Sequence, residues 1–416
     1  MNLLEKSHSC LVDILFEKHP FKLAVENTCT KTTTQSEDRK KLTNIVGCSL
    51  RHFYVFENLI SRVGDSFNNE QIVALLLYLS NRLFTPLFSS EDINGLLDKY
   101  TINAGVIEQL DAISVDKTKL IPDTFSNESI EYLHYRFNVP LWVLKMWMSH
   151  FKGYTYKIVK SINRPINHFA FASKGVEDIE KLLGQYREIE KTETEGLYKY
   201  NGNIPPVRHS LFKNGSLISI TPAEYYLLSK LDLDVLRKVA VYSEINSKIH
   251  SQLIGLVSKK MRIDYIAGTA EAYYPTKKDV ELRNLVNTNV YEAGHSSIIT
   301  CLSEKVHTMF VLPKNTNFAE LRKAPDYFNR LDQSALDGYL VNQLEALNNA
   351  SSFIENNGNL IYMVPTMDKK ETIQIVEKFL KQHPEFVLVE QKQFLPFDKY
   401  DSTLYFAILR NEGLND

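Results

Sequence analysis

The sequence predicts an α/β protein with an all-α N-terminal domain, a small α/β middle domain, and a mostly parallel C-terminal sheet closed by an antiparallel hairpin. The first part places apolar residues at three- and four-residue spacing, which is typical of amphipathic helices. The last part alternates apolar runs with helical stretches, which favours a parallel sheet covered by helices. We expect the domains at residues 1–130, 131–215 and 216–416.

Helical spacing runs through residues 1–130. The stretches "SCLVDILFEKH" and "KKLTNIVGCSLRHFYVFENLISRV" each predict helix. A further helix is predicted from "NNEQIVALLLYLSNRLF", which starts with two asparagines and has an acid in its first turn. Because this part of the sequence lacks a clear strand-like alternation, we expect an all-α domain.

The rest of the sequence contains candidate strands. His168 to Ala172 predicts a short strand in the middle domain, followed by a helix. From residue 216 the candidates are "KVAVYSE", "MRIDYIAG", "SSIITCL", "HTMFVL" and "NLIYMVP". The final runs "EFVLVEQ" and "STLYFAILR" have no helix between them and can pair antiparallel. A parallel sheet closed in this way is the arrangement of Rossmann-like methyltransferases.

The composition, with 44% hydrophobic and 24% charged residues, is typical of a soluble globular protein. A net charge of −2 gives no overall attraction to nucleic acid or membrane, so an RNA-binding surface has to be a local patch. The four scattered cysteines argue against a zinc site and a disulfide framework, and they suit a reducing cytoplasm. We see no signal peptide, and "IVALLLYL" is too short to span a bilayer, so we expect a cytoplasmic protein without a metal or a membrane partner.

Several segments along nearly the whole chain resemble one family in order and spacing. They are "EDRKKLTNIVGCSLRHFYVFENLI", "YRFNVPLWVLKMWMSHFKG", "LFKNGSLISITPAEYYLLSKLD", "LRKAPDYF" and "NNGNLIYMVPTMDKKETIQIVEKFLKQHPEF". The chain resembles the Sun/RsmB ribosomal RNA cytosine-C5 methyltransferases, which join a NusB-like helical domain to a Rossmann-like domain. The matching positions include Pro140, Trp142, Arg322, Pro325, Asp326, Gly358, Tyr362, Thr366 and Glu371.

The resemblance implies a covalent mechanism whose residues are missing here. In the family, a cysteine thiolate adds to carbon 6 of cytosine, and carbon 5 then takes the methyl group of S-adenosylmethionine. The attacking cysteine of the family's "TCT" loop falls on Pro365. The releasing cysteine and the aspartate of its "DAPCS" loop fall on Asn315 and Leu312. Proline, an amide and leucine cannot replace a thiolate or a carboxyl group.

The family's cofactor motif is also degenerate. Its glycine-rich turn falls on residues 241–250, which contain no glycine, and the acid expected on the ribose falls on Ala267. Glu244 adds a negative charge near the expected place of the methionine carboxylate. The resemblance implies S-adenosylmethionine as cofactor, and the motif predicts that its binding is lost. The loop's polar residues would bind another small ligand or simply face solvent: Ser243, Glu244, Asn246, Ser247 and Lys248.

Basic residues beside aromatic ones, or matched to the family, are candidates for RNA binding. They are Arg51, His52, Lys145, Lys152, Lys157 and Arg322. The alternative is that the aromatic residues are core and the lysines a solvated face. Cys301 is either a replacement nucleophile or a buried core cysteine. His250 and His295 lack metal-ligand spacing.

Three functions remain. The first, which the lost motifs favour, is a catalytically silent homologue of a 16S ribosomal RNA 5-methylcytosine methyltransferase that binds RNA, above all ribosomal RNA, or the ribosome. The second is an active S-adenosylmethionine-dependent enzyme with relocated catalytic groups. The third is a protein-interaction module whose NusB-like domain binds a ribosomal or transcription protein.

Overall fold

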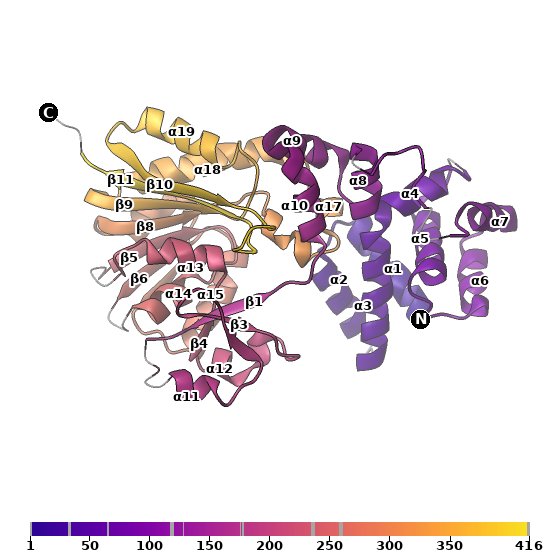
Figure 1. Ribbon diagram of the computed structural model, residues 1–416, viewed down its shortest axis with the longest axis horizontal. Helices are drawn as coiled ribbons and strands as arrows, with labels where there is room; N and C mark the ends of the chain where they lie inside the picture. Colours follow the sequence, from indigo (N-terminus) through magenta and orange to yellow (C-terminus); the bar gives the residue numbers. More distant parts are fainter. Residues whose placement is uncertain are drawn as a thin grey trace. The chain divides into compact units, whose positions relative to one another are not determined.

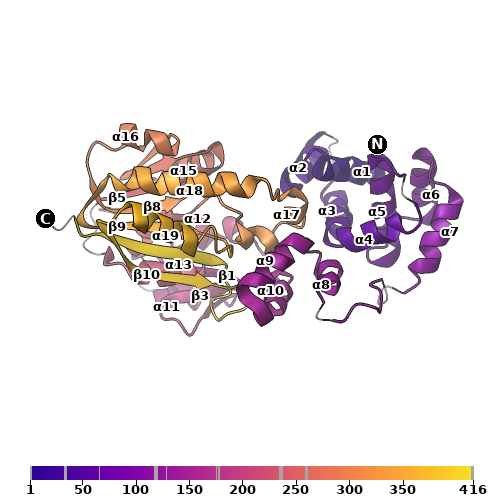
Figure 2. The ribbon, with the colours of Figure 1, turned by 90° about the horizontal axis from the view of Figure 1, so that it is seen from above.

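The computed structural model describes residues 2–31, 35–64, 66–116, 120–127, 129–174, 176, 179–233, 238–257 and 261–413. The chain divides into two compact units (Figures 1 and 2). One comprises Met1–Arg164 and Glu320–Asp332, and the other comprises Pro165–Ala319 and Gln333–Asp416. The finer division into three domains stays a prediction. In the described ranges, we find no helix with the length and apolar character needed to cross a membrane.

The first unit is helical, as the apolar spacing predicts. Its main helices are α1 (Leu3–Leu15), α2 (Phe21–Lys31), α3 (Ser36–Arg51), α4 (Phe53–Ser61), α5 (Asn69–Leu83), α6 (Ser90–Lys99), α7 (Ala104–Ile113), α8 (Ile130–Phe137), α9 (Leu141–Phe151) and α10 (Thr155–Ile162), with the 3₁₀ turn η1 (Lys152–Tyr154) between the last two. The apolar faces of α1 to α7 share one core. The predicted start of α5 is confirmed, because the side chain of Asn68 accepts a hydrogen bond from the N–H of Gln71 at 3.0 Å.

One predicted helix is in fact two. The apolar spacing continues from α3 into α4, but the backbone breaks at His52, where φ is −114° and ψ is 16°. The His52 ring stacks on Phe84 of the segment after α5, with 4.0 Å between ring centroids. This contact holds the corner, and a residue so distant in sequence gives no local signal of the break.

The segment Glu320–Asp332 follows strand β8 (Val306–Leu312) of the large sheet in sequence but belongs to the helical unit. It contains part of η5 (Phe318–Arg322) and the short helix α17 (Tyr327–Arg330). The fully buried Asp326 accepts a hydrogen bond from the N–H of Phe21, the first residue of α2, at 2.9 Å. It also accepts one from Arg330. A carboxylate at this place accepts from a backbone N–H that has no partner within the helix, and the positive end of the helix dipole stabilises its negative charge.

The second unit contains a small antiparallel sheet of order β2-β3-β1-β4. Its strands are β1 (His168–Ala172), β2 (Ile189–Lys191), β3 (Leu197–Tyr200) and β4 (Leu217–Ser219), accompanied by α11 (Ile179–Leu183), η2 (Pro206–Arg208), α12 (Ser210–Lys213) and α13 (Pro222–Ser229). The first of these strands is the one predicted from the sequence. Phe171 and Ile218 pack into the core beneath the large sheet. There Gly255 leaves no room for a side chain, since an added Cβ would lie 2.2 Å from Ile218.

The large sheet has the order β10-β11-β9-β8-β5-β6-β7 in the described part of the chain. Its strands are β5 (Lys238–Ser243), β6 (Arg262–Ala267), β7 (Thr288–Glu292), β8 (Val306–Leu312), β9 (Ile354–Val364), β10 (Phe386–Phe394) and β11 (Leu404–Asn411). Strands β5 to β9 are parallel, and β11 pairs antiparallel with both β9 and β10, so the predicted closing hairpin is confirmed. This is the Rossmann-like methyltransferase arrangement.

Helices cover both faces of this sheet (Figure 1). One face packs on α13, α14 (Ile249–Leu256) and α15 (Ala270–Leu282), and the other on α18 (Ala335–Ser351) and α19 (Ile373–Gln382). Successive residues of β5 lie on opposite faces of the sheet. Val241 packs in the core with α13, α14 and α15, and Tyr242 packs in the core with α18 and α19. Continuous apolar runs in the sequence therefore mark strands buried on both sides.

The prediction of a strand at "SSIITCL" is wrong. These residues form η4 (His295–Ser297) and the short helix α16 (Ile298–Cys301). Ile298, Cys301 and Leu302 lie on one helical face against the core under α18. A short apolar run does not distinguish a strand from a buried helical turn. The sequence does not predict strand β7, whose residues "TNVYE" are less apolar than those of the other strands of the large sheet.

Replacing Asp326 should weaken the helical unit. In D326N the amide loses the charge that binds Arg330 and the N-terminus of α2, and we expect a loss of about 2 kcal/mol in the free energy of unfolding. Urea unfolding followed by circular dichroism measures it. The control is E320Q, which removes only an exposed ion pair with Lys323. Equal free energies of unfolding for D326N and E320Q would contradict the role assigned to Asp326.

Candidate functional site

The large sheet reverses its strand order between β5 and β8. From β5 the chain adds β6 and β7 on one side, and β8 and β9 lie on the other. In open α/β sheets, ligands bind beyond the carboxyl ends of the strands at this reversal. Here the first residues beyond the strand ends are Glu244 after β5 and Pro313 after β8.

The side chain of Glu244 lies across this edge. Its carboxylate accepts hydrogen bonds from the N–H of Lys314 at 2.7 Å, from the Tyr242 hydroxyl at 2.8 Å, and from the Asn342 amide of α18. Its backbone N–H donates to the carbonyl of Leu312 at 2.9 Å, and its carbonyl accepts from Thr269. Glu244 thus joins the loops that follow β5, β6 and β8.

The loop after β6 is shaped around this glutamate. A Cβ added at Gly268 would lie 2.7 Å from Cγ of Glu244 and 2.5 Å from the hydroxyl of Tyr242. The burial of Tyr242 and the adjacent Glu244 carboxylate raise the pKa of the phenol, so the hydroxyl stays a proton donor. The donors at this edge are therefore already used by a carboxylate of the chain itself.

The remaining loop candidates are less central. The hydroxyl of Ser243 donates a hydrogen bond to the carbonyl of Ile245. The hydroxyl of Ser247 accepts one from the N–H of Ile249, so both side chains bond to the loop backbone. Asn246 and Lys248 are exposed. Ala267, at the position of the ribose acid, is buried at the end of β6 and offers no polar group.

Asp264, the acid of β6 nearest to Ala267, makes its contacts near the amino ends of the neighbouring strands. It is buried and pairs with Lys238 at 3.7 Å, at the start of β5, and it accepts a hydrogen bond from Asn289 at 2.7 Å. It therefore cannot replace the missing ribose acid. Taken together, these residues do not fit S-adenosylmethionine.

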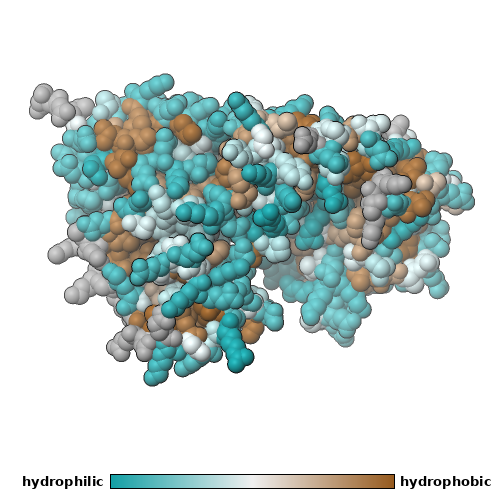
Figure 3. All heavy atoms as spheres, in the orientation of Figure 1, coloured by the Kyte–Doolittle hydropathy of each residue, from teal (hydrophilic) through white to brown (hydrophobic). Residues whose placement is uncertain are grey.

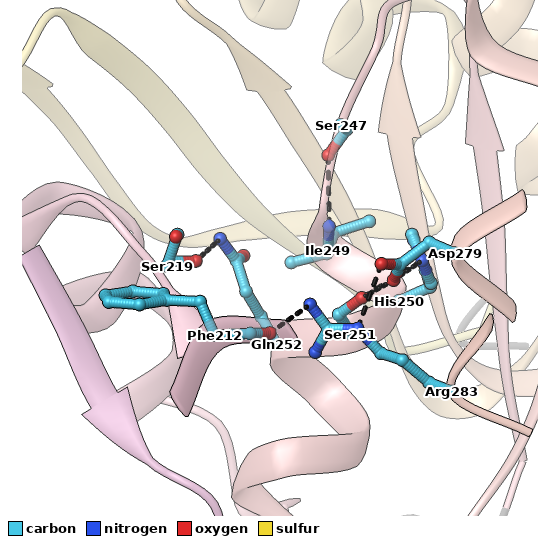
Figure 4. A network of polar contacts seen from close by, with 9 residues as sticks. All are labelled: Phe212, Ser219, Ser247, Ile249, His250, Ser251, Gln252, Asp279 and Arg283. Atoms are coloured by element: carbon cyan, nitrogen blue, oxygen red, sulfur yellow. Dashed lines mark hydrogen bonds and ion pairs between the residues drawn. The ribbon is translucent and has the colours of Figure 1, made fainter. Parts of the chain in front are cut away.

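The helix that follows the loop carries a polar network (Figure 4). His250 of α14 is buried and contacts Asp279 of α15 at 3.0 Å, and Ser251 donates to the same carboxylate oxygen. Arg283 binds the other oxygen at 2.9 Å. Burial alone would raise the pKa of Asp279, but these hydrogen bonds and the charge of Arg283 hold it below its usual value. Because Ser251 and Asp279 share one nitrogen of His250, the group is no proton relay, and it fastens α14 to α15.

The loops after β8 and β9 contain the positions that the resemblance compares with the catalytic cysteines. Leu312 is buried at the end of β8. The Asn315 amide donates to the carbonyl of Pro313 at 2.8 Å and accepts from the N–H of Asn317, which closes a local turn. The carbonyl of Pro365 accepts a hydrogen bond from the N–H of Ala319 at 3.2 Å. The two loops thus lie side by side without a nucleophile at either compared position.

A buried glutamate holds these two loops together. Glu371 accepts hydrogen bonds from the N–H and hydroxyl of Thr316 in the first loop and from the hydroxyl of Thr366 in the second. The amide of Gln343, on α18, donates to it at 2.9 Å. Tyr362 of β9 donates to the Glu371 carbonyl at 2.7 Å. Burial raises the pKa of Glu371 to about 7, although its hydrogen bonds act in the opposite direction.

The RNA-binding candidates lie at three places in the helical unit. These are the elements α9, η1 and α10, the segment Glu320–Asp332, and the corner between α3 and α4. Lys152 and Lys157 lie together on η1 and α10, and Lys145 is exposed on the adjacent α9. Arg322 donates from Nε to the carbonyl of Arg164 at 3.2 Å.

The remaining pair, Arg51 and His52, lies at the corner between α3 and α4. Arg51 is exposed. Burial lowers the pKa of His52 to about 4, so this stacked ring is neutral at physiological pH. His52 therefore contributes no positive charge there.

Cys301 is half-buried, and His295 pairs with Glu345 at 3.1 Å. Within the described ranges, no three His, Cys, Asp or Glu side chains gather in a way that could hold a metal ion. Sequence reasoning missed Asn342 and Gln343, which approach the edge from α18. They lie in an ordinary helical pattern, and only the fold shows that the middle of this helix lies beside the loops.

No protein-family model and no curated protein sequence matches the chain. Solved structures are similar in fold. One is described as "Crystal Structure of PH0851", with a TM-score of 0.73 and 16% identity over 98% of this chain and 99% of that one. A methyltransferase homolog protein from Pyrococcus horikoshii has a TM-score of 0.58 and 11% identity, over 69% of this chain and all of that one. NSun6 from Pyrococcus horikoshii, solved "with SFG", has a TM-score of 0.57 and 11% identity, over 67% of this chain and 100% of that one. At such low identities, the structural similarity shows the fold alone, which is methyltransferase-like.

The raised pKa of Glu371 predicts a pH dependence of stability. Since the folded state holds this proton more tightly than the unfolded state, the contribution is full below about pH 4.5 and is lost as the pH rises through 7. Relative to E371Q, which cannot titrate, the wild type should lose about 3 kcal/mol over that range. Urea unfolding at several pH values measures the difference. E377Q, at an exposed position of α19, should show no such slope, and a pH-independent difference for E371Q would contradict the assignment.

Proposed function

We propose that this protein binds RNA on a methyltransferase-like scaffold and does not transfer methyl groups. The carboxylate of Glu244 at the strand reversal carries the second half of this proposal. It occupies the donors of that edge, Lys314 N–H and Asn342, and it brings a negative charge. S-adenosylmethionine has a carboxylate of its own, and two like charges held close together repel each other by several kcal/mol in a protein interior.

The missing nucleophile supports the same conclusion. The compared cysteine positions hold Asn315 and Pro365, and both loops are closed by their own hydrogen bonds. Cys301 ends α16, which precedes β8 on the face covered by α18, and so it lies outside both loops. Relocated catalytic groups would therefore need a thiolate, and residues 313–319 and 365–372 contain no cysteine. Glu371 is enclosed by its partners and serves their packing.

The RNA half of the proposal rests on the resemblance to the Sun/RsmB ribosomal RNA enzymes and on the methyltransferase-like fold. We infer a ribosomal RNA as the ligand class, and a NusB-like role for the helical unit that includes binding to a ribosomal or transcription protein. The reduced cysteines favour the cytoplasm as the compartment.

Calorimetry with S-adenosylmethionine tests the loss of the cofactor. We expect no detectable binding by the wild type at millimolar ligand, and no transfer of labelled methyl groups to ribosomal RNA. E244G, which removes the charge and opens the edge, should gain measurable affinity, whereas E377Q should behave as the wild type. Micromolar binding by the wild type would show that the edge accepts the cofactor as it stands, and would revive the active enzyme.

A further inference from the structure

One stretch of the helical unit is strongly basic although the whole chain is not. From Tyr132 to Arg164 the sequence contains no acidic residue. Its basic residues are Arg136, Lys145, Lys152, Lys157, Lys160 and Arg164. In a chain of net charge −2, this separation of charge creates a local positive field.

The fold of this stretch exposes aromatic rings among the lysines. On α10, the buried residues are Thr155, Ile158, Val159, Ser161 and Ile162. The other positions of that helix therefore point outward. We call the exposed residues Lys152, Tyr154, Tyr156, Lys157 and Lys160 the α10 face. Tyr154 is 54% exposed and Tyr156 is 44% exposed.

Each ring contacts a neighbour in the helical unit and remains partly exposed. The ammonium group of Lys157 lies 5.2 Å from the ring centroid of Tyr154. Tyr156 meets Phe137 of α8 edge to face, with 6.2 Å between centroids. A ring already ordered by such contacts loses little side-chain entropy when it binds a ligand.

The backbone that presents Tyr154 is strained. Lys152, where α9 ends, has φ of 48° and ψ of −124°, a conformation that normally requires glycine. Such a conformation costs of order 1–3 kcal/mol and often marks a functional position. Here it turns the chain from α9 into η1, so that Tyr154 and Lys157 come to lie beside each other.

We propose that the α10 face binds single-stranded RNA, with bases stacked on Tyr154 and Tyr156 and phosphates bound by Lys152, Lys157 and Lys160. This inference rests on the proposed RNA-binding function and adds the surface and the strand state. Exposed aromatic rings among lysines bind unpaired bases, whose π-faces are accessible, whereas in a duplex those faces are stacked on one another. Lys157 and Lys160, one helical turn apart, share a side of α10 with Tyr156.

Fluorescence anisotropy with a labelled single-stranded RNA of mixed sequence tests the inference on the full chain. Y154A/Y156A should weaken binding about tenfold without changing its salt dependence. K157A/K160A should weaken it about as much and reduce the slope of log affinity against log salt by about 1–2. Y154F, which keeps the ring, should bind as the wild type.

The matched control is Y274A/K278A, which removes an exposed tyrosine and an exposed lysine on α15. It should leave the affinity unchanged. Thermal unfolding checks that each variant is folded.

The outcomes separate the two proposals. Tight RNA binding that both α10-face variants leave intact would overturn the assigned face and keep the proposed function. Equal or tighter binding of a duplex, insensitive to Y154A/Y156A, would overturn the single-strand assignment. Absence of RNA binding by the wild type itself would overturn the proposed function. Binding of an acidic protein in place of RNA would count against both.

Discussion

The carboxylate of Glu244 links the loops at the strand reversal of the large sheet, and much of the second unit depends on that link. Parallel strands end together at this edge, where backbone N–H groups lack partners within the sheet. A bound ligand can satisfy them, and so can a side chain of the protein. Here Glu244 satisfies Lys314 N–H and orders Asn342 of α18. At the place where this fold can hold a ligand, these two donors are therefore satisfied from within the chain.

A second carboxyl group supports the same edge from the other side. Glu371 ties the loops after β8 and β9 to α18 through Thr316, Thr366 and Gln343. Together the two glutamates fix both loops that the resemblance compares with the catalytic ones. A packed and hydrogen-bonded edge gives residues that match an enzyme family, such as Thr366 and Glu371, a structural purpose. Hydrophilic side chains cover most of the surface drawn in Figure 3, and apolar ones gather in several groups.

The sequence predicts the parts of the structure that local periodicity determines. It predicts the helical first unit, the strands β5, β6, β8 and β9, and the hairpin of β10 and β11. It misses the break at His52, the helical turn at Ile298–Cys301 and the strand β7. Tertiary contacts decide these three, as the stacking of His52 on Phe84 illustrates. At the site, the sequence identifies Glu244 as a misplaced charge, but its partners come from three separate segments and only the fold brings them together.

The inserted segment Glu320–Asp332 shows why the loop after β8 is more than a remnant of chemistry. It follows the large sheet in sequence, yet its Asp326 caps α2 and its Arg322 binds the carbonyl that follows α10. A change in Glu320–Asp332 therefore alters the packing of the helical unit. These contacts constrain the residues of the segment through the stability of the helical unit alone, independently of the residues at the compared cysteine positions. Arg322, Pro325 and Asp326 can match a family of enzymes for this physical reason, and their presence is no argument for methyl transfer.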